Sequence, residues 1–431
     1  MRMKGDNTLA NKTDDSKLTA LERAWVLYDV GNSAFTMIAC SLIPIWFKEL
    51  AKLGGEDAIA HATSNWAYVT AIVTVIVAII GPVCGTITDN KGFKKPIFTT
   101  ALAIGLICCI WLGFVDDWKM FLIVYIIAKV AYSSANTFYD SMLTDVTTPE
   151  RSDRVSSYGY AWGYIGSCLP FTVALIFFMA GEGMLGGFKV TQMTARIVGC
   201  IATAAWWLIV TLPLLKHYEQ KYYVIPEKGA IKEAFIRIGA TLKRIAKEEK
   251  QILYFLIAFF LYIDGVGTII DNCINIGTDL NLDTVGQVIF LLLTQVVAWL
   301  FSLVFSRLSK KYDTVTLILV CIAGYFCVSF YALFLKNLWQ FAIMAFGVGM
   351  FQGSIQALSR SYFSKIIPAE NSGEYFGLYD IFSKGASCLG SLLIGIVKDT
   401  TGSIQIAVAT LTIFFALGFF FLKKADSIKK V

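Results

Sequence analysis

Acidic, amide and basic side chains recur at helical spacing inside long apolar runs of this sequence. Asp29, Asn32 and Thr36 lie three and then four positions apart, so a helix places them on one face. Lys129 and Asn136 share a face of a later run in the same way. Lipid penalises such faces by several kcal/mol, about 2.5–3.5 for an aspartate near mid-membrane. We therefore expect them to look inward, onto other helices or a water-filled cavity.

Similar polar faces on further runs complete a candidate binding site. A lysine there could bind a carboxylate and an aspartate an ammonium group, which together would hold a small zwitterion. We expect Lys129 to pair with Asp29, and Lys384 with Asp264 or Asp271; the alternative is that static ion pairs brace the helices. The aromatic members could stack on a sugar or simply pack. The candidate binding residues are Tyr28, Asp29, Asn32, Lys129, Asn136, Trp162, Tyr164, Asp264, Thr268, Gln352, Gln356 and Lys384.

The elements that must position these side chains are membrane-spanning helices. The chain has 431 residues, of which 56% are hydrophobic and 16% charged, and its mean hydropathy is +0.64. Soluble domains are nearer 25% charged, so this composition predicts an all-α polytopic membrane protein. Hydropathy places twelve spans at 25–47, 66–87, 96–114, 119–140, 155–180, 195–215, 251–277, 284–306, 314–335, 338–361, 375–397 and 403–422.

The spans divide into two halves that resemble each other. Leu27-Tyr28-Asp29-Val30-Gly31 in span 1 has a counterpart in Leu261-Tyr262-Ile263-Asp264-Gly265 in span 7. We expect two pseudo-symmetric six-helix bundles, as in many secondary transporters. The predicted organisation is an N-tail (1–24), an N-terminal bundle (25–215), an amphipathic linker (216–250), a C-terminal bundle (251–422) and a C-tail (423–431).

The distribution of basic residues predicts the orientation. The net charge is +6, and most of the 37 lysines and arginines fall in the tails, the linker and every second loop. This bias predicts that both termini are cytoplasmic and argues against a nucleic-acid partner. The linker repeats apolar residues at helical spacing among basic ones, as in a helix lying at an anionic lipid surface.

Other classes of protein find little support in the sequence. Most of the ten cysteines lie in apolar runs and none forms a Cys-x-x-Cys pair, while both histidines, His61 and His217, fall in loops. We expect no metal and no cofactor. An intramembrane enzyme would need a His-Glu-x-x-His motif or a Gly-x-Ser-x-Gly elbow, and neither occurs. A receptor or scaffold stays open, although it leaves the intramembrane charges unexplained.

The loop after span 2 carries a recognisable signature. Gly85-Thr-Ile-Thr-Asp89-Asn90-Lys91-Gly92-Phe93-Lys94-Lys95 resembles the loop 2–3 signature of the major facilitator superfamily, with Asn90 where that signature has a basic residue. The resemblance implies a cytoplasmic latch whose charges exchange partners as the two halves rock. Asp140, Arg151 and Arg154 also lie near that side. The predicted cytoplasmic gate is Gly85, Asp89, Gly92, Lys94, Asp140, Arg151 and Arg154.

Several motifs resemble one branch of that superfamily, the autophagy-related vacuolar amino-acid effluxers and their bacterial relatives. They include Trp25-Val-Leu-Tyr28-Asp29-Val-Gly31-Asn32-Ser33-Ala34, Asp145-Val-Thr-Thr148-Pro149-Glu150-Arg151 and Gln352-Gly353-Ser354-Ile-Gln356-Ala357-Leu358-Ser359-Arg360. The resemblance implies a transporter in which spans 1, 4, 7 and 10 line a central cavity. We expect it to move an amino acid or similar zwitterion by rocker-switch alternating access; the alternative is a sugar–cation symporter of the melibiose type.

The remaining expectations concern coupling, location and partners. Asp264, Asp271 and Asp380 are candidates to carry a coupling proton or sodium ion, because a carboxylate in a cavity can be neutralised by protonation; uniport is equally compatible. Compact loops favour a plasma (inner) membrane over a vacuole. The expected partners are a small-molecule substrate and the lipid bilayer, and we expect a monomer because no apolar surface stands out as a dimer face.

Overall fold

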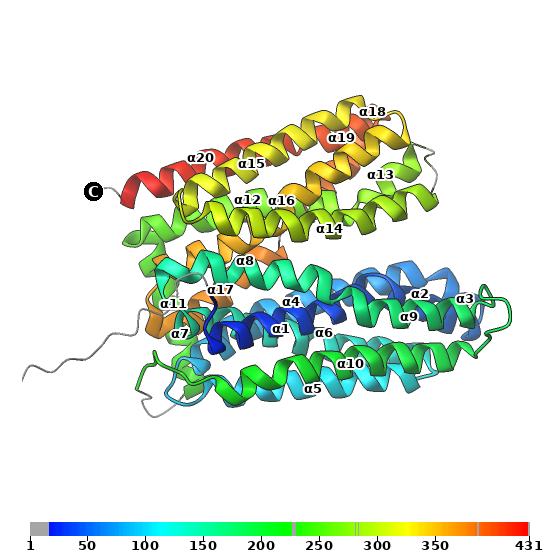
Figure 1. Ribbon diagram of the computed structural model, residues 1–431, viewed down its shortest axis with the longest axis horizontal. Helices are drawn as coiled ribbons and strands as arrows, with labels where there is room; N and C mark the ends of the chain where they lie inside the picture. The colour runs from blue at the N-terminus through cyan, green and yellow to red at the C-terminus, as the bar shows by residue number, and fades with distance from the viewer. Residues whose placement is uncertain (1–16, 226–229, 281, 283, 386–387, 430–431) are drawn as a thin grey trace, which may run out of the picture.

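The computed structural model describes residues 17–225, 230–280, 282, 284–385 and 388–429, and most of them are helical (Figure 1). The helices of the first half are α1 (Ala20–Cys40), α2 (Leu42–Leu53), α3 (Glu56–Ala60), α4 (Ala62–Thr88), α5 (Lys94–Phe114), α6 (Trp118–Ser141), α7 (Leu143–Val146), α8 (Pro149–Gly166), α9 (Cys168–Gly181) and α10 (Gln192–His217). Those that follow are α11 (Ala230–Lys247), α12 (Lys250–Asp271), α13 (Cys273–Asp279), α14 (Thr284–Leu308), α15 (Thr314–Tyr331), α16 (Leu338–Ile366), α17 (Ser372–Gly385), α18 (Cys388–Thr401), α19 (Ile404–Ala409) and α20 (Thr412–Lys429).

The protein is an all-helical, multi-pass membrane protein. Within the described residues, ten helices are long and apolar enough to cross a bilayer. Helices suit that environment because they satisfy every backbone hydrogen bond internally. The predicted spans 284–306 and 375–397 coincide with α14 and with the α17–α18 pair; the apolar stretch of α14 is the shorter Leu292–Leu308. The count of twelve spans therefore stays a prediction.

Local sequence explains where several helices begin and bend. Thr19 and Glu22 form a capping box at the start of α1, in which each side chain accepts a hydrogen bond from the other residue's backbone N–H. Asp117 and Asn337 cap α6 and α16 in a simpler way. The first span is broken at Ser41, whose hydroxyl donates to the carbonyl of Met37, so that α1 and α2 form two segments of one span.

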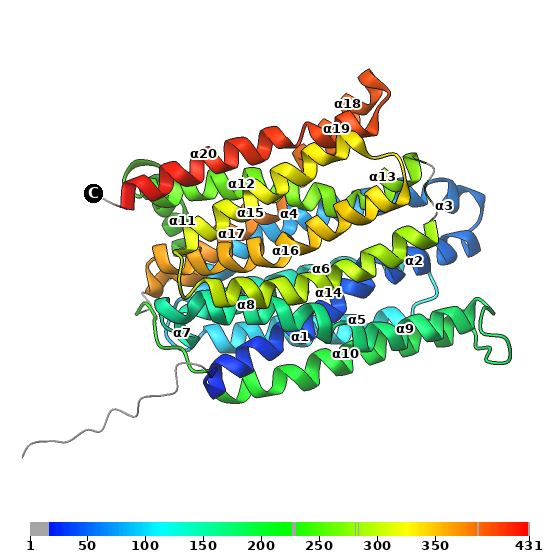
Figure 2. The same ribbon diagram turned by 45° about the horizontal axis from the view of Figure 1, so that its top comes forward.

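Two separate hydrophobic cores show that the chain forms two bundles. One core draws its buried side chains from the range 24–218 and the other from 245–425. Figures 1 and 2 show the corresponding bundles side by side, with α8, α4 and α17 between them. Across the interface α4 packs on α17, and α8 packs on α14 and α16. This arrangement agrees with the predicted fold class.

The two ends of the molecule differ. The helix α1 begins and α20 ends at the same end, on the left in Figure 1, which we call the termini end; the opposite end is the distal end. The amphipathic segment predicted within 216–250 contains α11, which also lies at the termini end. There Arg237 of α11 pairs with Glu374 of α17 at 3.3 Å, and α11 packs on α4 and α12. The linker helix is thus docked on the bundles.

Candidate functional site

A polar cavity of about 550 Å³ lies between the two bundles. Its walls come from α1, α6 and α8 of the first half and from α12, α14, α16 and α17 of the second. The lining residues Cys40 and Asp271 are exposed and lie toward the distal end. The polar lining residues are Asp29, Asn32, Ser33, Thr36, Tyr132, Asn136, Tyr139, Asp140, Tyr160, Tyr164, Ser167, Asp271, Gln295, Gln352, Gln356, Arg360 and Ser383.

Three charged side chains form the floor of this cavity, at its side nearer the termini end. Arg360 of α16 donates from Nη2 to Asp29 Oδ2 of α1 at 2.9 Å and from Nη1 to Asp140 Oδ1 of α6 at 2.9 Å. Its Nε donates to the hydroxyl of Ser156 at 2.9 Å. One planar guanidinium therefore joins three helices of the first half to the second half. We call Asp29, Asp140 and Arg360 the charged floor.

Aromatic rings complete the surroundings of the guanidinium. The Arg360 Cζ lies 4.6 Å from the ring centroid of Trp25 and 4.5 Å from that of Tyr160. Arg360 is 2% exposed and Asp29 7%. Such a buried ion pair tolerates desolvation only when its hydrogen bonds are satisfied, and here each end of the guanidinium fork has an acceptor. The floor therefore has both signs of charge at the cavity surface.

Half of the predicted binding residues line the cavity. They are Asp29, Asn32, Asn136, Tyr164, Gln352 and Gln356. The amide groups stand on α1, α6 and α16, so hydrogen-bonding groups from both bundles surround the same space. Asp271, predicted as a coupling residue, lines the cavity as well.

Two predicted aromatic residues do not line the cavity. Tyr28 is fully buried, and its hydroxyl donates to Asn136 Oδ1 at 3.1 Å, so it positions a lining residue from behind. Trp162 is 43% exposed and lies on the outer flank of the first bundle, with its ring centroid 6.3 Å from that of Trp299. Tyr160 and Tyr164 face the cavity. Trp162 is two positions from each of them, which places it on the opposite side of α8. Trp162 therefore faces away from the cavity.

Asp264 and Thr268, the two predicted binding residues on α12, lie away from the cavity. Asp264 is 1% exposed, and both carboxylate oxygens accept from Gly390 N at 3.1 Å near the start of α18. Thr268 is fully buried beside it. Neither lines the cavity; the Asp264 carboxylate is instead held by the backbone at the start of α18. The side chain of Lys384, the predicted partner of Asp264, lies outside the described residues.

Two more predictions need correction. The residue that pairs with Asp29 is Arg360, whereas the Lys129 ammonium lies 5.0 Å from the ring centroid of Tyr132 and does not line the cavity. Asp380, a coupling candidate, accepts from Thr137 Oγ1 at 2.9 Å and joins α17 to α6 outside the cavity.

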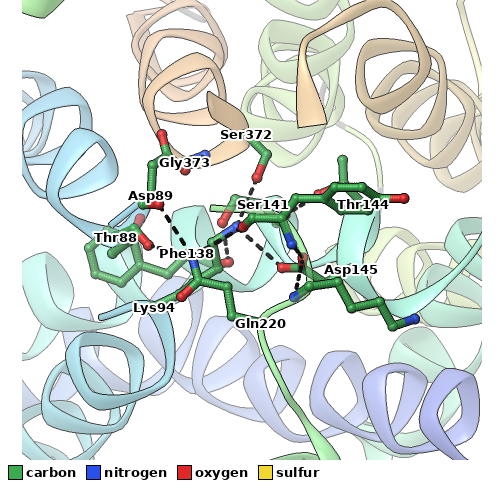
Figure 3. A network of polar contacts seen from close by, with 12 residues as sticks. Thr88, Asp89, Lys94, Phe138, Ser141, Thr144, Asp145, Gln220, Ser372 and Gly373 are labelled. Carbon is green, nitrogen blue, oxygen red and sulfur yellow. Dashed lines mark hydrogen bonds and ion pairs between the residues drawn. The ribbon is translucent and has the colours of Figure 1, made fainter. Parts of the chain in front are cut away.

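The predicted latch after α4 joins the two halves at the termini end (Figure 3). The buried Asp89 carboxylate accepts from the backbone N–H groups of Gly373 (2.7 Å) and Glu374 (2.9 Å) at the start of α17. Gly85 faces the same turn, and a Cβ there would lie 2.2 Å from the Gly373 oxygen. Burial raises the pKa of Asp89 to about 7, although Lys94 and the two N–H donors act to lower it.

A second buried network adjoins the first (Figure 3). The Lys94 ammonium is fully buried, 3.3 Å from Asp145 Oδ2, and donates to Ser372 Oγ at 2.8 Å. Asp145 also accepts from the hydroxyl of Tyr218 at 2.6 Å. Gly92, predicted at a tight turn, has a φ of +80° there. These contacts connect α5, α7, the linker and α17.

Asp153 supplies a third link between the halves. It pairs with Lys365 at 2.7 Å and accepts from Thr314 (2.7 Å) and Ser361 (2.5 Å), all in the second half. Ser156 donates to the carbonyl of Ala357 at 2.7 Å. Together with the charged floor, these contacts close the termini end of the cavity.

Three of the predicted gate residues, Asp140, Arg151 and Arg154, lie outside the latch that follows α4. Asp140 belongs to the charged floor, and the described contacts of Arg151 stay within the first half, where it pairs with Glu22 at 2.8 Å. Arg154 lies over the ring of Tyr158, 5.5 Å from its centroid, on the outer flank. The sequence reading missed Arg360 as a site residue. Its signal was present, because Gln352, Gln356 and Arg360 follow one another at four-residue intervals along one face.

Two helical bundles around a closed-ended polar cavity define the class of protein. The fold is that of the major facilitator superfamily of transporters, as comparison with solved structures shows. The MFS transporter FucP in the outward conformation matches with a TM-score of 0.69 over 94% of this chain and 97% of that chain, at 13% identity. A bacterial homologue of the iron transporter ferroportin, in an outward-facing state, matches with a TM-score of 0.69 over 95% and 98%, at 12% identity. At these identities the likeness concerns the fold alone.

Sequence relatives define the family. The profile of the family described as "Vacuole effluxer Atg22 like" matches residues 20–430, and the chain belongs to this family. An uncharacterised MFS-type transporter, YxiO of Bacillus subtilis, is 38% identical over 405 residues, covering 93% of this chain and 94% of the relative. Autophagy-related protein 22 of Eremothecium gossypii is 23% identical over 447 residues, covering 88% and 86%. The protein is therefore a major facilitator superfamily transporter and not an enzyme, as the sequence predicted.

Proposed function

We propose that this transporter moves a small zwitterion, most simply an amino acid, and that the cavity above the charged floor is its binding site. The pair formed by Asp29 and Arg360 carries the proposal. A carboxylate for an ammonium group and a guanidinium for a carboxylate stand 2.9 Å apart at the cavity surface, so both ends of one small solute could exchange with partners already in place.

The rest of the cavity supports a polar solute of that size. A volume of about 550 Å³ is within the ordinary range of small-molecule sites and leaves room for water. Asn32, Asn136, Gln352 and Gln356 can donate and accept hydrogen bonds around the solute. Because α1 and α6 hold two of these amides and α16 the other two, a bound solute would contact both bundles.

The transport cycle we propose is rocker-switch alternating access. The termini end is closed by contacts of Asp89, Lys94, Asp153 and Arg360, whereas the exposed lining residues lie toward the distal end. Opening the termini end would need all four groups to leave their partners in the other half. A solute that replaces the Asp29–Arg360 contact with contacts of its own would reduce the cost of that step.

We propose further that the termini end is cytoplasmic, that the protein lies in the plasma (inner) membrane and that it works as a monomer. Most basic residues fall in segments at the termini end, as the positive-inside rule requires of a cytoplasmic surface. Asp271 is the coupling candidate that lines the cavity, so it is the residue at which we would look for a coupling proton or sodium ion.

The alternative, a sugar–cation symporter, relied on Trp162 as a stacking surface and on the carboxylates of spans 1 and 7. Trp162 lies outside the cavity, and a neutral sugar would leave the buried charges of the floor without a role. Tyrosines at 132, 160 and 164 could still stack on a sugar ring. The zwitterion is therefore the preferred substrate class.

A thermal-shift screen of the detergent-purified protein tests the proposal. Amino acids, sugars, nucleosides and organic acids are added in turn, since a ligand that binds only the folded state raises its melting temperature. We expect at least one amino acid to stabilise the wild type and to lose this effect in Asp29→Asn. Stabilisation by sugars alone, or an amino-acid effect unchanged in Asp29→Asn, would overturn the proposal.

A further inference from the structure

A second cavity, of about 590 Å³, lies on the outer flank of the first bundle. Its walls come from α1, α8 and α10, together with residues 17 and 18 before α1. It shares no lining residue with the central cavity. We call it the flank groove. All of its walls belong to one half of the chain, so it is distinct from the site between the halves.

Basic side chains surround the end of the flank groove nearest the termini end. Lys17, Arg23 and Arg154 line it there, and no acidic residue is among the described residues that do so. The position of Lys17 is fixed, because its carbonyl accepts from the Arg151 guanidinium at 2.8 Å. The Arg154 guanidinium lies over the Tyr158 ring, which orients it along the wall.

The remainder of the groove is apolar. Val26, Val30 and Leu27 of α1 face Trp162 of α8 and Trp206 of α10. Leu27 is 36% and Trp162 43% exposed. Within a helix that crosses the bilayer, such exposed apolar side chains lie in lipid. The indole N–H of Trp206 is buried and has no hydrogen-bond partner in the described part of the chain.

We propose that the flank groove binds one anionic phospholipid. Its phosphate would lie among Lys17, Arg23 and Arg154, and an acyl chain would run between the valines of α1 and the two tryptophans. Charge complementarity selects this occupant: three cations at the membrane interface and an apolar trough below them match an anionic headgroup and its chain. Only the assignment to the cytoplasmic leaflet rests on the orientation proposed above.

This site should act on one bundle as a unit. The opposite side of α8 holds Asp153 and Ser156, which contact the second half. The lipid would therefore brace the helix that supports the closing contacts.

Native mass spectrometry of the full-length protein in detergent tests the proposal. Phosphatidylglycerol and phosphatidylcholine with the same acyl chains are titrated separately. We expect one phosphatidylglycerol to bind more tightly than the rest and than any phosphatidylcholine. The variants Arg23→Gln and Arg154→Gln should each weaken that binding about fivefold, the loss expected for one interfacial basic residue. The matched control, Lys310→Gln with Lys311→Gln, removes exposed charges from the second half and should leave it unchanged.

A second readout locates the lipid. Phosphatidylglycerol brominated in its acyl chain quenches nearby tryptophan, so quenching should decrease in Trp162→Phe and in Trp206→Phe, each checked for an unchanged gel-filtration profile. Equal affinity for both lipids, equal losses in the control, or quenching unaffected by both substitutions would overturn the proposal. None of these measurements needs a transported solute, so they stand apart from the test of the central cavity.

Discussion

Replacing Arg360 with glutamine should open the termini end of the transporter. The substitution removes the group that donates to Asp29 and Asp140 while leaving Asp29 buried and Asp140 partly buried in the first half. In the closed state these two anions would face each other without a counter-ion. In the open state water could reach them. The substitution therefore destabilises the closed state selectively.

The magnitude follows from the burial of the pair. Removing one partner of a buried ion pair costs about 3–5 kcal/mol, and Arg360 is 2% and Asp29 7% exposed. Such a change shifts the ratio of closed to open states by a factor of roughly 10² to several times 10³. The contacts of Asp89, Lys94 and Asp153 remain and oppose opening. An open population of a few per cent would thus become the major one.

Pulsed electron paramagnetic resonance between spin labels at two exposed positions of the termini end can measure this shift. Lys91→Cys lies in the first half and Lys311→Cys in the second, in a background where the exposed Cys40 and Cys327 are serine. We expect a single short distance in the wild type and a longer one to dominate in Arg360→Gln.

The charge argument also predicts a rescue. The triple variant Arg360→Gln, Asp29→Asn and Asp140→Asn contains none of the three charges, so the closed state should recover most of its population. An unchanged distance distribution in Arg360→Gln would refute the reasoning. So would a triple variant that is more open than the single one, because the uncompensated charges could not then be the cause.

Three further predictions concern the other contacts at the termini end. Gly85→Val should lengthen the same spin-label distance, since its Cβ would lie 2.2 Å from the Gly373 oxygen; an unchanged distance would contradict this. The folded-state pKa of Asp89, about 7, exceeds the ordinary 3.8, so the melting temperature of the wild type should fall as the pH rises between these values. In Asp89→Asn the melting temperature should depend less on pH, and equal slopes in the two proteins would contradict this. Lys94→Met should lower thermal stability by about 3–5 kcal/mol and Lys94→Met with Asp145→Asn by less; a more severe double variant would contradict this.

The sequence predicted much of the fold, because hydropathy alone marks spans. It also placed polar faces on α1, α6 and α16 correctly, since Asp29, Asn136 and Gln352 all line the cavity. The rotation of a helix about its own axis was harder to predict. Asp264 stands on a polar face as regular as that of Asp29, yet its carboxylate meets the backbone of α18.

Other features of the site needed the three-dimensional arrangement. Arg360 pairs with a residue 331 positions away in the chain, and periodicity within one span carries no information about such a partner. Trp162 was a different case. Its separation of two positions from both Tyr160 and Tyr164 already places it on the far side of α8, so the sequence alone could have excluded it from the cavity.

Uptake into proteoliposomes tests the central claim most directly. Purified wild type and Arg360→Lys are reconstituted at matched protein content and incubated with a mixture of labelled amino acids. We expect the wild type to take up at least one amino acid faster than protein-free liposomes. Arg360→Lys should slow it by about tenfold or more, because a single ammonium cannot reproduce the two-pronged contact with Asp29 and Asp140. No amino-acid uptake by the wild type, or uptake at the wild-type rate in Arg360→Lys, would contradict the account.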